Sequence, residues 1–203
     1  MSTDQNFSED TMASVYQGPI FSMLQRAKAV SRGSSFVVAV TSAQSKSGIT
    51  YVSRMLAESL NRDAPGNAVV VDCRSLSSDP ALALREMNGS HMRAERGSAL
   101  MPSGGWRGNP EFRQAYLDRL RQQYAYVIVD CPSISESSDV LGLTGMVDGI
   151  VSIVEANRTS KSQIKYLERT IQQANGVLLG HVLNKRTYII PEWIYSRMER
   201  MGL

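Results

Sequence analysis

The sequence predicts an α/β fold with a doubly wound, mostly parallel sheet. Segments in which apolar residues recur at helical spacing alternate with short, buried-looking runs rich in β-branched residues, a pattern typical of a parallel sheet covered on both faces. Polar and acidic residues follow the ends of these runs, where such sheets bind ligands. The predicted strands are 36–40, 68–71, 126–129, 149–154 and 177–183.

One domain is expected, preceded by a short flexible segment. Residues 1–15 are rich in Ser, Asp and Asn, which favours a flexible chain. Residues 16–203 are long enough to bury one sizeable core and are predicted to form a single domain. Its first helix is expected within 18–30, with Pro19 in the first turn.

Further helices are predicted between the strands. A short helix is expected among the glycine-rich loops of 79–108. Asn109-Pro110 is typical of a helix start, and Thr159 or Ser160 is expected to cap a later helix that stops at Gly176. The helix after the first strand has an apolar face made of Ile49, Val52, Met55, Leu56 and Leu60.

Composition narrows the functional classes. The chain has 42% hydrophobic and 20% charged residues, as a soluble globular protein does, and its net charge of +3 gives no support for nucleic-acid binding. Only two histidines and two cysteines occur, so neither a His/Cys metal site nor a disulfide framework is expected. Cys73 and Cys131 each follow a strand-end aspartate and are expected to be neighbouring packing thiols. No segment has the signature of a signal peptide or of a membrane span, so we expect a cytoplasmic protein.

The segment FVVAVTSAQSKSGIT, residues 36–50, is predicted to be a strand, a phosphate-binding loop and a helix start. In such loops, backbone N–H groups and the helix N-terminus cradle phosphate, and a lysine offsets its charge. The pattern G-x-x-x-x-G-K-[ST] falls on Ala43, Gly48, Ile49 and Thr50. The lysine is therefore replaced by Ile49, while the glycine and the hydroxyl that faces the metal remain.

Two strand-end aspartates complete the candidate site. Asp72 follows VVV and Asp130 follows VIV. Carboxylate oxygens suit magnesium, so Thr50, Asp72 and Asp130 are the candidate metal ligands if a nucleotide binds. A residual catalytic role of the two aspartates is also considered, against the alternative that they only cap loops.

The order TSAQSKSGIT, VVVDCR, YAYVIVDCPSI, VDGIVSIVEANRTSK and VLLGHVLNK resembles the cytoplasmic domain of bacterial tyrosine autokinases and, more broadly, the MinD/ParA-type P-loop ATPases. The resemblance covers about residues 16–195, and the tail TYIIPEWIYSRM is similar to the ending of some polysaccharide-system members. It implies a P-loop NTPase fold. It also implies a subunit of exopolysaccharide export that docks on a membrane chain-length regulator, a polysaccharide co-polymerase.

The resemblance also assigns roles to residues. It places Asp72 in the second acidic motif of the nucleotide site (Walker A′), Asp130 in Walker B and Asn184 on the adenine side. The cofactor-binding candidates are Lys46, Ser47, Gly48, Thr50 and Asn184.

Several departures from the family pattern bear on function. Besides Ile49, Gln44 replaces the second lysine of MinD/ParA-type loops, and Ser45-Lys46-Ser47-Gly48 replaces Pro-Gly-Glu-Gly. The E-x-x-R-x-x-R interface motif is not seen in residues 16–26, and no tyrosine cluster ends the chain. Losing one charge-assisted hydrogen bond of roughly 1.5–3 kcal/mol would weaken phosphate binding by about 10- to 150-fold.

The leading hypothesis is therefore a catalytically degenerate, regulatory or scaffolding subunit, held at the inner membrane through its partner. No cofactor is expected, and ATP with magnesium, bound with weakened affinity, is the alternative. An active tyrosine autokinase or ATPase that uses Lys46 as a substitute stays open, as do a MinD/ParA-type positioning protein and a homo-oligomer.

Overall fold

The computed structural model describes residues 22–24, 35–63, 66–73 and 110–186. The strands are β1 (Phe36–Ser42), β2 (Ala68–Asp72), β3 (Tyr126–Asp130), β4 (Gly149–Glu155) and β5 (Leu178–Asn184). The helices are α2 (Ile49–Asp63), α4 (Pro110–Gln123), the short 3₁₀ helix η1 (Asp139–Leu143) and α5 (Lys161–Gln173).

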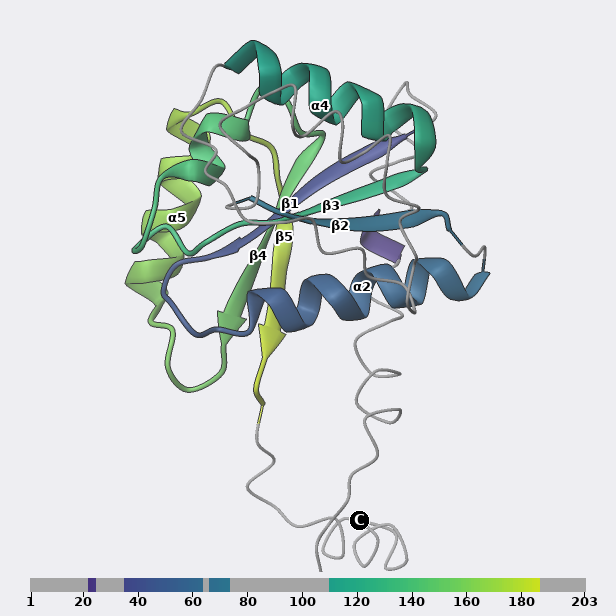
Figure 1. Ribbon diagram of the computed structural model, residues 1–203. Coiled ribbons are helices and arrows are strands. Elements are labelled where there is room, and N and C mark those ends of the chain that lie inside the picture. The colour runs from purple at the N-terminus through teal and green to yellow at the C-terminus, as the bar shows by residue number, and fades with distance from the viewer. Residues whose placement is uncertain (1–21, 25–34, 64–65, 74–109, 187–203) are drawn as a thin grey trace, which may run out of the picture.

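All five described strands are parallel, in the order β2-β3-β1-β4-β5 (Figure 1). The chain leaves the central strand β1 toward one side of the sheet, through β2 and β3, and then continues on the other side with β4 and β5. The carboxyl end of β1 is thus the point where the winding direction changes, the usual ligand position in open α/β sheets. The predicted α/β, doubly wound, parallel fold is confirmed.

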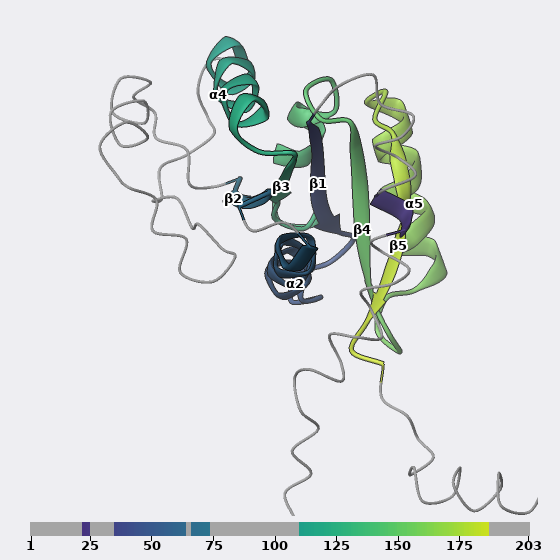
Figure 2. The same ribbon diagram turned by 90° about the vertical axis from the view of Figure 1, so that its right-hand side faces the viewer.

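Apolar side chains from both faces of the sheet build two core layers. On one face, α4 and α5 pack through residues such as Tyr116, Leu120 and Leu167. On the other face, α2 packs through Val52, Leu56 and Leu60. Figures 1 and 2 show α2 and α4 on opposite sides of β2 and β3. Because both faces are covered, β1 is buried along its whole length, which explains its continuous apolar sequence.

The helix boundaries agree with the local signals, with one difference. The first residue of α4 is Pro110, and Ser160 caps α5 in a reciprocal capping box with Gln163. The predicted stop at Gly176 is displaced, since Asn175 takes the left-handed backbone with φ of 55°. Gly176 has a different role, because a Cβ there would lie 2.8 Å from the Ile171 side chain.

Some sequence predictions fall outside the described residues. They are the flexible segment 1–15, most of the helix within 18–30, the short helix within 79–108 and the tail after 186. Among the described residues, no helix is long and apolar enough to cross a bilayer.

Candidate functional site: a clasped phosphate-binding loop

The loop 43–48 joins β1 to α2 at the central position of the sheet. Its shape is fixed from within, because the Ser42 and Ser47 hydroxyls both donate to the carbonyl of Gln44, at 2.6 and 2.8 Å. Lys46 and Gly48 have positive φ angles of 63° and 87°. These bonds fold the loop tightly before α2 begins.

Asn184, at the end of β5, holds the loop from outside. Its side-chain Nδ2 donates to the Ser47 carbonyl at 2.9 Å, and the residue is 7% exposed. A Cβ on Gly48 would lie only 2.2 Å from this nitrogen. Glycine is therefore required at position 48 both by its backbone angle and by the close approach of the amide. The sequence resemblance assigned Asn184 to the adenine side, and the structure places it against the loop.

Lys185 adds a second contact beside Asn184. Its Nζ donates to the Lys46 carbonyl at 2.5 Å and lies 3.2 Å from Oε1 of Glu155. Arg158 donates to the other Glu155 oxygen at 3.0 Å. Burial acts to raise the pKa of Glu155, but the hydrogen bonds from Lys185 and Arg158 outweigh it and lower the pKa. The side chain of Arg158 is thus engaged in an ion pair with Glu155.

Gln44 ties the loop to the connection between β4 and α5. Its Nε2 donates to Thr159 Oγ1 at 3.1 Å, and its Oε1 accepts from Gln163 Nε2 at 3.3 Å. Thr159 Oγ1 also accepts from the backbone N–H of Glu155 at 3.0 Å. The position that carries a lysine in MinD/ParA-type loops is thus occupied by a side chain that bonds within the fold. We call Gln44, Glu155, Thr159, Asn184 and Lys185 the loop clasp.

The residues at positions 49 and 50 differ in environment. The half-buried side chain of Ile49 packs against the core layer on the α2 face. Thr50 is exposed on the first turn of α2. The side chain that should reach phosphate is therefore an apolar contact of the core, while the hydroxyl that would face a metal is accessible.

The two predicted aspartates meet at the same edge of the sheet. Asp72 pairs in register with Asp130, and Asp130 pairs with Val40 of β1, so Asp130 is the closer of the two to the loop-bearing strand. Both are half-buried. No group of three His, Cys, Asp or Glu side chains within the described ranges is arranged to hold a metal ion. A magnesium ion here would rely on Thr50, the aspartates and its nucleotide.

Cys73 and Cys131 follow these aspartates and are buried neighbours. They are 0% and 1% exposed, and the backbone N–H of Cys73 donates to the Asp130 carbonyl at 2.8 Å. Burial, and next the hydrogen-bonded Cys73 thiol, raise the pKa of Cys131. The structure agrees with two packing thiols.

The structure therefore brings Lys46, Ser47, Gly48 and Asn184 into direct contact and places Asp72 beside Asp130. Sequence reasoning missed the roles of Gln44, Glu155, Thr159 and Lys185 in the clasp. The one available signal was their place in the sequence: Glu155 is the last residue of β4, Thr159 follows that strand, and Lys185 follows β5. The contacts of Thr159 with Gln44 and of Lys185 with Lys46 join positions more than a hundred residues apart and have no local pattern.

No family model matches the chain. It is similar to a putative tyrosine-protein kinase CapB of Staphylococcus aureus, with 29% identity over 69 residues, 34% of this chain and 30% of that protein. It is also similar to the tyrosine-protein kinase CpsD of Streptococcus agalactiae, with 26% identity over 92 residues, 42% of this chain and 40% of CpsD. The matches thus span less than half of these relatives' own lengths.

Solved structures extend the similarity over most of the chain. The kinase domain of VpsO has a TM-score of 0.65 at 22% identity, covering 87% of this chain and 96% of that one. The chimerical protein CapA2B2 has a TM-score of 0.67 at 19% identity, covering 91% and 88%. MinD of Aquifex aeolicus has a TM-score of 0.56 at 14% identity, covering 81% and 73%. The resemblance to bacterial tyrosine kinases and the P-loop NTPase fold are confirmed.

Proposed function

We propose that this chain is a kinase-like subunit of a bacterial capsule or exopolysaccharide assembly system, and that it acts as a regulatory or scaffolding protein with little phosphoryl-transfer activity. Its relatives by sequence are named tyrosine kinases, which supports the family. The half-buried Ile49 side chain packs against the core at the position of the phosphate lysine, and this observation carries the degenerate part of the proposal.

The physical argument rests on charge. Phosphoryl transfer depends mainly on positioning and on neutralising the charge of the transferred group. Ile49 supplies no charge, which weakens phosphate binding by about 10- to 150-fold when a charge-assisted hydrogen bond is lost. Transfer suffers more than binding, because the charge that develops in the transition state also lacks its partner.

The loop clasp supports the same conclusion. Bonds from Gln44 of the loop to Thr159, and from Asn184 and Lys185 to the loop carbonyls, tie the loop to the strand ends around it. A loop that side chains of the fold hold in place suits a domain that is kept for its shape. If ATP binds, the loop backbone and Lys46 would face its phosphates, and Thr50 with the two aspartates would hold magnesium, a cation that supplies charge neutralisation.

The partner belongs to the proposal as well. The resemblance implies a membrane chain-length regulator, a polysaccharide co-polymerase, which would bring the chain to the inner membrane. Co-purification of the tagged chain with that regulator, and its loss from membrane fractions when the regulator is deleted, would test this. Equal membrane recovery with and without the regulator would contradict it.

Titration calorimetry with ATP and magnesium tests the degenerate site directly. The unmodified chain is expected to bind weakly and to show no turnover. Ile49→Lys is expected to raise affinity by about 10- to 150-fold, whereas the uncharged control Ile49→Met should not. Micromolar affinity with measurable turnover in the unmodified chain would overturn the inactive assignment. No gain from Ile49→Lys would show that the clasped loop no longer accepts phosphate.

The second candidate is an active ATP-dependent tyrosine autokinase in which Lys46 replaces the missing lysine. The exposed Lys46 side chain favours it, because it makes no bond to any side chain in the described ranges and is free to turn toward a phosphate. Incubation with labelled ATP decides between the two. Label on tyrosine that disappears in Lys46→Ala but persists in the exposed-lysine control Lys161→Ala would favour the active kinase.

A MinD/ParA-type positioning protein is the weaker alternative. A positioning function of this type would require dimerisation that depends on ATP and on a lysine at the position where this chain has Gln44. Gln44 is bonded to Thr159 and Gln163 within one chain, so we expect sedimentation to show no ATP-dependent change of mass.

A further inference from the structure

The positive charge of the chain is concentrated in one part of the fold. Residues 149–186, which contain β4, α5 and β5, have six Lys or Arg and two Asp or Glu, a net charge of +4, although the whole chain carries only +3. One of the two acids, Glu155, is already bonded to Lys185 and Arg158. The small net charge of the chain therefore conceals a cationic surface, and such a surface attracts an anionic partner.

The outer face of α5 carries a row of cations. Lys161, Lys165 and Arg169 follow one another at four-residue spacing and are exposed. The buried residues Leu167 and Ile171 face the sheet from the other side of the helix. Within the described ranges none of the three cations takes part in an ion pair. Like charges at this spacing repel and destabilise a helix, so the row lowers the stability of α5.

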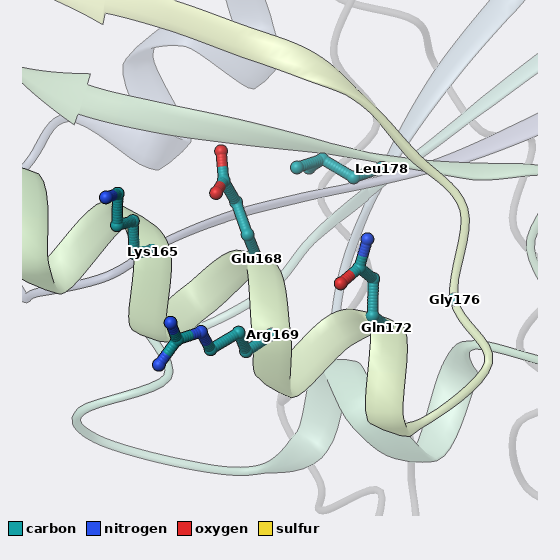
Figure 3. Close-up of a pocket in the computed structure, with 6 residues that line it drawn as sticks. All are labelled: Lys165, Glu168, Arg169, Gln172, Gly176 and Leu178. Carbon is teal, nitrogen blue, oxygen red and sulfur yellow. The ribbon is translucent and has the colours of Figure 1, made fainter.

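The only acid of α5 is turned away from this row. Figure 3 shows Glu168 directed into the space between the helix and β5, whereas Arg169 is directed away from that space. Glu168 lines a pocket of about 590 Å³ there, and its Oε1 lies 2.9 Å from Nε2 of His181 on β5. By contrast, α2 carries two arginines and two acids. The cations of α5 are thus not neutralised by their own helix.

An exposed aromatic ring lies beside the cations. Tyr166 is 63% exposed, the largest value among the large hydrophobic side chains of the described residues. It lies three positions before Arg169 and therefore on the adjoining helix surface. Tyrosine is enriched at membrane–water interfaces, because its ring contacts the apolar side while its hydroxyl stays in water. Cations beside such a ring are the side chains that a lipid surface with anionic headgroups would contact.

We propose that the outer face of α5 lies against an anionic lipid surface and orients the chain on the membrane. Lys161 and Arg169 are about 12 Å apart along the helix axis, so a straight helix can bring the whole row to one plane. Each cation near such a surface, within a Debye length of about 8 Å, contributes about fivefold to binding. Three of them enrich the chain at the surface by about 100-fold. The spread charge of lipid headgroups needs no groove to receive it.

This contact is separate from docking on the chain-length regulator. It is weak alone, and it becomes effective once a partner holds the chain close to the membrane, because the second contact is then intramolecular. The purified chain with protein-free vesicles tests the lipid contact without the regulator. Failure of that test would leave the proposed function unchanged.

Flotation of the full chain with vesicles is the experiment. Vesicles of phosphatidylglycerol and phosphatidylcholine in equal parts should carry the chain at low salt, whereas vesicles of phosphatidylcholine alone should not. Added salt shortens the Debye length and should release the chain. Tyr166→Ser should weaken the binding, and Tyr166→Trp should preserve it, since tryptophan is also enriched at the interface.

Variants separate the row from general charge effects. K165Q/R169Q should weaken binding by about 25-fold, with an unchanged circular dichroism spectrum. The matched control R54Q/R62Q removes two exposed arginines from α2, on the opposite face of the sheet, and should leave binding unchanged. No flotation with the anionic vesicles at low salt, or equal losses in the two double variants, would overturn the proposal. A polyglutamate peptide that binds through the row while vesicles do not would also overturn it, and would assign the row to an acidic protein.

Discussion

Replacing Gly48 with alanine is the sharpest test of how the loop is held. The new Cβ would lie 2.2 Å from Nδ2 of Asn184, which donates to the Ser47 carbonyl at 2.9 Å. Because Asn184 is buried, its amide cannot move aside without losing that bond. The backbone φ of 87° at position 48 adds strain to any residue with a side chain.

The expected cost follows from these contributions. A left-handed backbone costs about 1–2 kcal/mol, and a buried donor left without its partner costs about 1–3 kcal/mol. The lower entropy of the unfolded alanine chain offsets about 0.4–1 kcal/mol. We therefore expect Gly48→Ala to lower the free energy of unfolding by about 1–5 kcal/mol, with a central value near 3 kcal/mol.

Urea denaturation followed by circular dichroism measures this change. Gly66→Ala is a matched control, because Gly66 has a similar φ of 78° but its Cβ would meet nothing within 4 Å in the described ranges. It should cost only about 1 kcal/mol. In an Asn184→Ala background the clash is absent, so Gly48→Ala should fall to the same value. Equal costs of the two glycine substitutions in the unmodified chain would refute the clasp.

Three further predictions concern the capping of α5, the pH dependence of the clasp and the buried thiols. Ser160→Ala should lower the free energy of unfolding by about 1 kcal/mol, measured in urea, whereas Ser162→Ala should stay within about 0.5 kcal/mol. The pKa of Glu155 is lowered in the folded chain, so its stabilising effect is present at neutral pH and is lost as pH falls through that lowered pKa. Lys185→Gln should raise its titration midpoint in NMR, and an unchanged midpoint would contradict the contact. The buried Cys131, whose pKa is raised, should resist alkylation in the native chain and react in denaturing urea; rapid native labelling would show that the site opens.

The fold was predictable because its signals are local. Each apolar run becomes a strand with a boundary displaced by one or two residues, and Pro110 and Ser160 begin their helices as their chemistry predicts. Gly176 was the exception: the neighbouring Asn175 takes the left-handed position, and Gly176 instead relieves a contact with Ile171. Close packing, which a helix-stop pattern does not encode, decided that difference.

The sequence by itself determined the parallel α/β fold, the loop after β1 and the absence of its lysine, because these depend on residue type and short spacing. Only the tertiary structure decided which residues surround the loop in which that lysine is missing. Asn184 reaches Ser47 across 137 positions in the chain and Gln44 reaches Thr159 across 115. Such pairs form because parallel strands bring their carboxyl ends to one edge of the sheet. The physical reason is packing: the half-buried Ile49 packs against the core on the α2 face, and the loop is held by side chains whose proximity no local pattern records.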